Sequence, residues 1–180
     1  ASIAARIKNT RTPLSIDFGV GDVIVPKQEK RKIPTQLDDF TAPVVSTYSL
    51  ETTIAEKIDA ILSLMEFSSR MKDYYDIYYL ANKFDFDGKV LTEALKKTFE
   101  NRGHTFTIEQ FEQVMSFADD SAMQKKWKAF CRKIDTQTDD FSIVLRTIKV
   151  FLTKLFIAVL SKTEFSQQWI AAESQWKKGV

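Results

Sequence analysis

The sequence predicts an α+β fold, and three features carry this prediction. Two short β-branched or aromatic runs, residues 15–19 and 22–25, are joined through a Gly-Val-Gly turn, as is typical of strands. After residue 49, apolar residues recur with the period of α-helices. The 180 residues are 44% hydrophobic and 28% charged, a balance that can bury a core.

The first 48 residues are expected to form a small sheet. Residues 26–42 are polar, carry two prolines and indicate a loop or a ragged edge segment. Residues 43–48 could add one more short strand. Because strands precede helices along the chain, we expect a partial sheet region over 1–48 and a predominantly helical domain over 49–180.

Capping residues mark where several helices begin. Ser49 is a suitable N-cap for a helix that runs to about residue 66. Asp87 suits the start of a helix that ends near Gly103, and Thr107-Ile-Glu-Gln110 is a capping box. The remaining helices are expected over residues 68–82, 119–134, 138–161 and 166–177.

One lysine lies unusually close to the apolar side of the first helix. With each residue turned by about 100°, Lys57 falls roughly 20° outside the apolar arc. Glu56 and Asp59 are expected to face solvent. Lys57 could be a lysine whose stem packs while its ammonium reaches water, or a cation placed at a functional cleft.

The second helix carries two carboxylates on a largely apolar and aromatic surface. Asp73 and Asp76 lie on the same side, within one turn of each other. Embedded carboxylates need a cation, hydrogen-bond donors or a metal. They could form an ion-pair lattice with Arg70 and Lys72 that fixes helix packing, or they could serve a functional site.

Asp17 is the third candidate acidic residue. It lies in a strand-like run whose neighbours, Ile16 and Phe18, would point to the other face of the strand. A carboxylate beside a glycine turn is a common position for a metal ligand. An aspartate on the exposed face of a strand is the simpler interpretation of the residue taken alone.

Taken together, these residues resemble the motifs of AbiEii/AbiGii-type nucleotidyltransferase toxins. The segment Ala55-Glu-Lys57, followed by Arg70-Met-Lys-Asp-Tyr-Tyr-Asp76, is similar in order and separation to the paired helical motifs of that family. Ile16-Asp-Phe-Gly-Val-Gly-Asp22 resembles the strand that supplies a late acidic residue in the family's fold. The resemblance is densest over residues 15–80.

The resemblance implies phosphoryl-transfer chemistry. In such enzymes two carboxylates that follow a Gly-Ser turn hold Mg²⁺ against a nucleoside triphosphate, and a third orients the acceptor hydroxyl. Asp17 would be the third carboxylate and a metal ligand, and Lys57 would meet the triphosphate. Asp73 or Asp76 would position the lysine or assist the metal centre, and Arg70 would be a second phosphate contact.

The chain departs from the family's pattern at its amino end. No Gly-Ser turn with a following Asp-x-Asp pair precedes Asp17, and Gly19-Val-Gly21 lacks the lysine and helix of a P-loop. We therefore expect the carboxyl-terminal part of a toxin, inactive alone and without bound Mg²⁺ or triphosphate. The resemblance implies that the full-length toxin modifies an RNA, such as tRNA, or a protein. It also implies a role in abortive phage infection and restraint by a cognate antitoxin.

A non-enzymatic helical interaction module or RNA-binding module is the alternative. In this interpretation Lys57, Asp73 and Asp76 are only structural. A basic helix around Trp127 could follow an RNA backbone, although such charge runs are more often solvated faces. Its candidate RNA contacts are Lys125, Lys126, Lys128 and Arg132.

The sequence contains one cysteine and one histidine. Cys131 lies near Trp127 and Phe130 and is expected to be a packed thiol, and a Cys–His nucleophile would need His104 to meet it. One cysteine suits a reducing compartment. Residues 1–12 lack the apolar run of a signal peptide, and residues 141–160 carry three basic side chains that are costly in a bilayer. We expect a cytoplasmic protein without a membrane partner.

Overall fold

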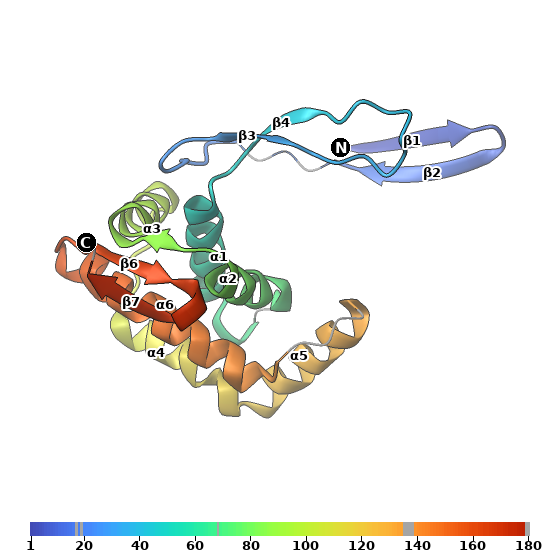
Figure 1. Ribbon diagram of the computed structural model, residues 1–180. Coiled ribbons are helices and arrows are strands. Elements are labelled where there is room, and N and C mark those ends of the chain that lie inside the picture. Colours follow the sequence, from blue (N-terminus) through green and yellow to red (C-terminus); the bar gives the residue numbers. More distant parts are fainter. Residues whose placement is uncertain (17, 19, 68, 135–138, 179–180) are drawn as a thin grey trace.

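A computed structural model describes residues 1–16, 18, 20–67, 69–134 and 139–178. A body of packed helices carries two β-hairpins beyond one end, and a third hairpin lies against the body (Figure 1). All paired strands are antiparallel within the described residues. The predicted α+β class is therefore confirmed.

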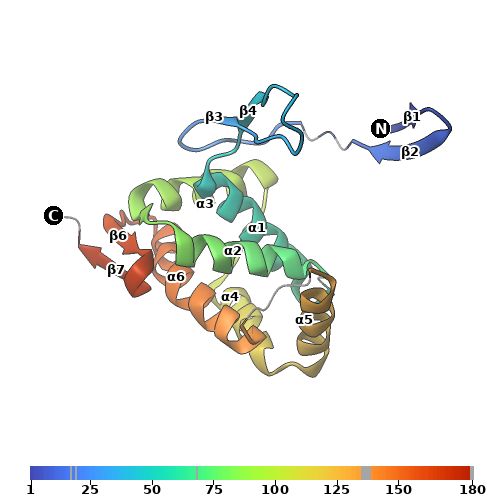
Figure 2. The same cartoon turned by 45° about the vertical axis from the view of Figure 1, so that its right-hand side comes forward.

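The first two hairpins lie outside the helical body (Figures 1 and 2). Strands β1 (Ser2–Ile7) and β2 (Thr10–Ser15) pair with each other, as do β3 (Glu29–Lys32) and β4 (Val44–Thr47). The expected strand over 43–48 is confirmed as β4. Its partner β3 lies within 26–42, where the sequence indicates a loop or ragged edge.

The two strands expected over 15–19 and 22–25 are wrong in the described residues. Ser15 ends β2, and residues 22–25 belong to no strand. The second run is buried against a helix: the Val25 N–H donates to Thr52 Oγ1 at 2.8 Å, and the Ser49 hydroxyl donates to the Val25 carbonyl. Val25 is only 4% exposed, so docking on a helix replaces sheet pairing as the way to bury this segment.

The predicted helix starts are largely confirmed. Ser49 Oγ accepts from the Thr52 N–H, and Thr107 forms the expected capping box. The second helix begins at Met71, after Arg70, while Ser68 lies outside the described residues. The helices are α1 (Leu50–Leu64), α2 (Met71–Lys83), α3 (Gly88–Arg102), α4 (Ile108–Met115), α5 (Ser121–Ile134) and α6 (Phe141–Ser161), with short 3-10 helices η1 (Met65–Phe67) and η2 (Ser116–Asp119).

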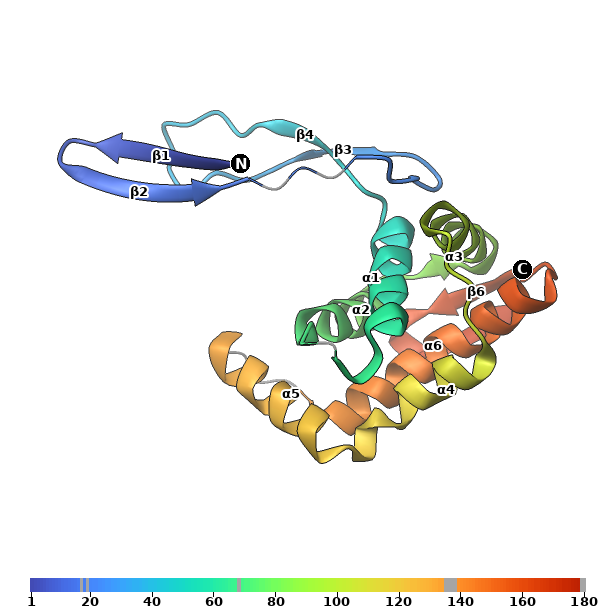
Figure 3. The same ribbon diagram turned by 180° about the vertical axis from the view of Figure 1, so that it is seen from behind.

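Helix α6 is the centre of the hydrophobic core. It packs against α2, α3 and α4, while α1 packs against α2 and α3 (Figure 3). Phe151 on α6 is fully buried, and Phe156 stacks on Phe111 of α4 with ring centroids 4.8 Å apart. This packing places one end of α3 and the start of α2 on either side of α1.

The helix expected over 166–177 is wrong. The segment forms β6 (Gln167–Ile170), η3 (Ala171–Glu173) and β7 (Gln175–Lys178), and β6 also pairs with the short strand β5 (Phe86–Asp87). Trp169 lies opposite Trp176 in the hairpin, and their indole N–H groups donate to the backbone carbonyls of Ala81 and Phe151. Tertiary burial of the two indoles favours the hairpin.

Candidate functional site

A groove of about 470 Å³ follows α1, between the start of α2 and the end of α3. Most of the residues that line it are polar or charged, and they combine cationic and acidic side chains from three helices. The groove is lined by Tyr48, Thr53, Glu56, Lys57, Asp59, Ala60, Ser63, Leu64, Arg70, Asp73, Arg102 and His104.

On the α2 side, Lys57 is held by two carboxylates. Its Nζ lies 2.9 Å from Asp73 Oδ1 and 2.7 Å from Asp76 Oδ2. Burial alone lowers the pKa of Lys57, but the hydrogen bonds to Asp73 and Asp76 outweigh it and raise the pKa above its ordinary value. The groove therefore contains an oriented lysine that is fully charged at neutral pH.

The same carboxylates bind two further cations. Arg70 Nε lies 2.6 Å from Asp73 Oδ2, and Lys72 Nζ lies 2.6 Å from Asp76 Oδ2. Asp73 is only 3% exposed, so its ionic partners replace the water that it loses. The ion-pair lattice considered from the sequence thus exists and includes Lys57. Lys57, Arg70 and Asp73 also line the groove, so the lattice and an accessible site coincide.

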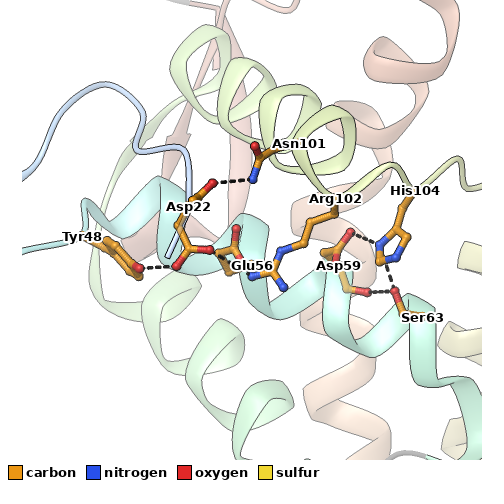
Figure 4. Close-up of polar contacts among 9 residues, drawn as sticks. Asp22, Tyr48, Glu56, Asp59, Ser63, Asn101, Arg102 and His104 are labelled. Atoms are coloured by element: carbon orange, nitrogen blue, oxygen red, sulfur yellow. Dashed lines mark hydrogen bonds and ion pairs between the residues drawn. The ribbon is translucent and has the colours of Figure 1, made fainter. Parts of the chain in front are cut away.

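On the α3 side, Arg102 joins three segments of the chain (Figure 4). Its guanidinium pairs with Glu56 of α1 and lies 3.4 Å from Asp22, whose carboxylate also accepts from the Tyr48 hydroxyl. Burial raises the pKa of Glu56, and Arg102 opposes this shift. The Asn101 amide donates to the Gly21 carbonyl at 2.9 Å, so this wall also holds the segment that precedes β3.

Farther along α1, His104 contacts Asp59 and Ser63 (Figure 4). His104 Nδ1 lies 2.8 Å from Asp59 Oδ1 and 3.2 Å from Ser63 Oγ. Asp59 is 4% exposed, which corrects the expectation that it faces solvent. The end of α3 covers this side of α1, and the helical period of α1 alone could not reveal that neighbour.

The comparison with protein families identifies the family of the chain. Residues 1–154 match the family model described as "Nucleotidyl transferase AbiEii toxin, Type IV TA system", which is most of the chain. The chain belongs to the AbiEii nucleotidyltransferase toxin family. No curated protein and no solved structure matches it.

Membership in the AbiEii family makes the protein a nucleotidyltransferase-like toxin of a type IV toxin–antitoxin system. An antitoxin is therefore its expected class of partner. None of the helices in the described part of the chain is long and apolar enough to cross a membrane.

The candidate residues named from the sequence fall into three groups. Lys57, Arg70, Asp73 and Asp76 are brought together by α1 and α2. Asp17 lies outside the described residues. The candidate RNA contacts lie on α5, which contributes no residue to the lining of the groove within the described chain: Lys125, Lys126, Lys128 and Arg132.

Sequence reasoning missed the α3 wall of the groove. Arg102 and His104 flank Gly103, which adopts φ 66° and ends α3. A Gly at a helix end was a recognisable signal for a turn. Nothing in the sequence pattern, however, pairs that turn with α1, because the contact joins residues more than 40 positions apart, such as Asp59 and His104.

Proposed function

We propose that this AbiEii-family toxin uses the groove to transfer a nucleotide from a nucleoside triphosphate to an RNA acceptor. The observation that supports this proposal best is the oriented Lys57 ammonium on an open groove. A cation already held in place stabilises phosphate charge without first losing side-chain freedom. Lys57 would bind the triphosphate, and Asp73 and Asp76 would position the Lys57 side chain. Arg70 would be a second phosphate contact.

Magnesium is part of the proposal, but the described part of the groove does not fit it. Asp73 and Asp76 are already bound by Lys57, Arg70 and Lys72, and no group of three suitable ligands occurs among the described residues. We therefore assign Asp73 and Asp76 to positioning Lys57. The proposed metal ligand and third carboxylate remains Asp17.

Helix α5 favours RNA over protein as the acceptor. The helix contains five basic residues and no acidic residue, and Lys125, Lys128 and Arg132 are exposed. Their spacing of three and four residues places them along one face. The Lys126 ammonium donates to the Glu66 carbonyl at 2.9 Å, which ties α5 to η1, the 3-10 helix between α1 and α2. A positive helix anchored at η1 suits a polyphosphate backbone.

The decisive experiment compares two lysines of the same ion-pair cluster. Transfer of label from α-³²P nucleoside triphosphates to total tRNA is measured with the toxin. Lys57→Met should lower transfer by the toxin by about 10²-fold or more, since it removes a charge that acts on the phosphates. Lys72→Met, which removes an exposed partner of Asp76, should retain activity within about twofold.

The same assay separates the alternatives. Label on protein in place of RNA would replace the RNA acceptor by a protein acceptor. Equal activity of the two lysine variants, each folded by circular dichroism, would contradict the role of Lys57. A toxin that binds RNA but neither binds nor transfers a nucleotide would favour the non-enzymatic module.

A further inference from the structure

His104 is the only histidine of the chain, and the end of α3 aims its ring at α1. Gly103 adopts a left-handed conformation with φ 66°, and the His104 N–H then donates to the Phe99 carbonyl at 3.0 Å. The ring also packs on Phe106, with centroids 5.5 Å apart. These contacts fix both the direction and the plane of the imidazole.

The hydrogen bonds around Nδ1 decide which ring nitrogen carries the hydrogen. The Ser63 hydroxyl donates its single hydrogen to the Asp59 carbonyl at 2.8 Å, so Ser63 Oγ can only accept from His104. The Asp59 carboxylate is also only an acceptor. Nδ1 therefore holds the hydrogen, and in the neutral ring Nε2 has the lone pair.

Nε2 is the nitrogen that a bound molecule can meet. His104 lines the groove that Lys57 and Arg102 also line, and its side chain is 38% exposed. No hydrogen bond engages Nε2 within the described part of the chain. This is the arrangement of an imidazole that accepts protons: a carboxylate is hydrogen-bonded to one ring nitrogen, and the other nitrogen has an accessible lone pair. The carboxylate stabilises the imidazolium cation that forms.

We propose that His104 takes the proton of the RNA hydroxyl that becomes nucleotidylated, an inference that rests on the proposed function. The hydroxyl O–H bond breaks and its proton passes to Nε2 while the oxygen bonds to the α-phosphorus of the triphosphate. The bond from that phosphorus to the bridging oxygen breaks, and pyrophosphate leaves with the electron pair. Asp59 and Ser63 are positioning residues: they hold the hydrogen on Nδ1, so that the lone pair of the neutral ring is on Nε2, and Asp59 stabilises the imidazolium that forms.

The first test observes the tautomer directly. With ¹⁵N-labelled histidine, the chain gives signals from one imidazole only. The neutral ring should show a protonated Nδ1 and an unprotonated Nε2, and Asp59→Asn should weaken this preference. A ring protonated at Nε2 would overturn the proposal, because the nitrogen that faces the groove would have no lone pair.

The second test asks whether RNA covers Nε2. Diethyl pyrocarbonate acylates unprotonated imidazole, and mass spectrometry of the His104 peptide gives the rate. Total tRNA, at a concentration shown by gel shift to saturate the chain, should slow this acylation at least fivefold. Binding of tRNA without protection would overturn the inference alone. Absence of tRNA binding would overturn the RNA acceptor of the proposed function and the inference with it.

The third test separates chemistry from structure in nucleotidyl transfer by the toxin. In His104→Asn the amide nitrogen can still donate to Asp59 where Nδ1 does, so the fold should be retained while the proton acceptor is lost. We expect nucleotidyl transfer to fall by about 10²-fold or more, with tRNA affinity within about threefold of the wild type. His104→Ala should lose the same activity and also stability. Wild-type transfer rates in His104→Asn would overturn the role of His104.

Discussion

Lys57 illustrates how single residues define this molecule. Asp73 is buried beside it, and a buried carboxylate without a cation would cost several kcal/mol. Lys57 and Arg70 supply that charge from two directions, at 2.9 and 2.6 Å. The ion pair with Asp73 restrains the Lys57 side chain, which would otherwise sample many rotamers. This restraint holds the Lys57 ammonium at the edge of the groove.

The stability contributed by Lys57 should depend on pH. Its pKa is raised above the ordinary 10.5 because the bonds to Asp73 and Asp76 outweigh the opposing effect of burial. The folded state therefore binds the proton more tightly than the unfolded state. The stabilisation is complete below pH 10.5 and is lost as the pH rises through the folded-state pKa.

Urea unfolding of Lys57→Met tests this expectation. At neutral pH the variant should be less stable than the wild type by about 2 kcal/mol, between the values typical of exposed and buried pairs. The difference should shrink above pH 10.5. Lys72→Met is the matched control, with an expected loss below about 0.5 kcal/mol because its ion pair is exposed. A difference that stays constant into the alkaline range would contradict the assignment.

At the scale of elements, helix α3 is held in place at both of its ends. At its start, Asp87 Oδ1 accepts from the N–H groups of Lys89 and Val90, and Asp87 Oδ2 accepts from Gln168 of β6. At its end, Gly103 closes the helix and turns the chain toward α1. Because the helix is rigid, these two ends set where Arg102 and His104 meet the groove.

Asp87→Ala should destabilise the protein by about 1 kcal/mol, since it removes the N-cap of α3. Burial alone raises the pKa of Asp87, but the hydrogen bonds from Gln168, Val90 and Lys89 outweigh it and lower the pKa below 3.8. The ionised carboxylate therefore stabilises the fold above pH 3.8, and this contribution is lost as the pH falls through the lowered pKa.

Chemical unfolding at several pH values measures this effect. The difference in the free energy of unfolding between the wild type and Asp87→Ala should become smaller at acidic pH. Asp87→Asn, which can still cap the helix but does not titrate, should retain most of the stability at all pH values. An equal loss in both variants at neutral pH would show that charge, and not capping, is the stabilising feature.

At the scale of the whole molecule, the last hairpin packs against the helical body. The β6–β7 hairpin lies along α6 (Figure 1), and Trp169 is fully buried between α2 and α6, with its ring centroid 4.8 Å from that of Phe151. The family match ends at residue 154, within α6, so this hairpin lies beyond the matched segment. Its aromatic packing nevertheless belongs to the same core that positions α2 and α3.

Trp169→Ala should lower the free energy of unfolding by about 3–5 kcal/mol, as large core aromatics do when truncated. Trp169→Phe keeps most of the ring but loses the indole N–H bond to Ala81, and should cost about 1–3 kcal/mol. Gln175→Ala, an exposed position of the same hairpin, is the control and should have little effect. Wild-type stability of Trp169→Ala in urea would show that the hairpin folds independently of the body.

The sequence by itself determined the helical body from 49 to 161, its caps at Ser49, Asp87 and Thr107, and the Lys57–Asp73–Asp76 cluster. These features depend on local hydrogen bonds, on helical period and on residues in two consecutive helices, all of which are visible within short segments. Only the tertiary structure decided the Trp169–Trp176 hairpin and the docking of Val25 on α1. It also decided the contact of His104 with Asp59. Each of these depends on a partner distant along the chain, because burial of an indole, a backbone segment or a carboxylate is decided by what the fold places next to it.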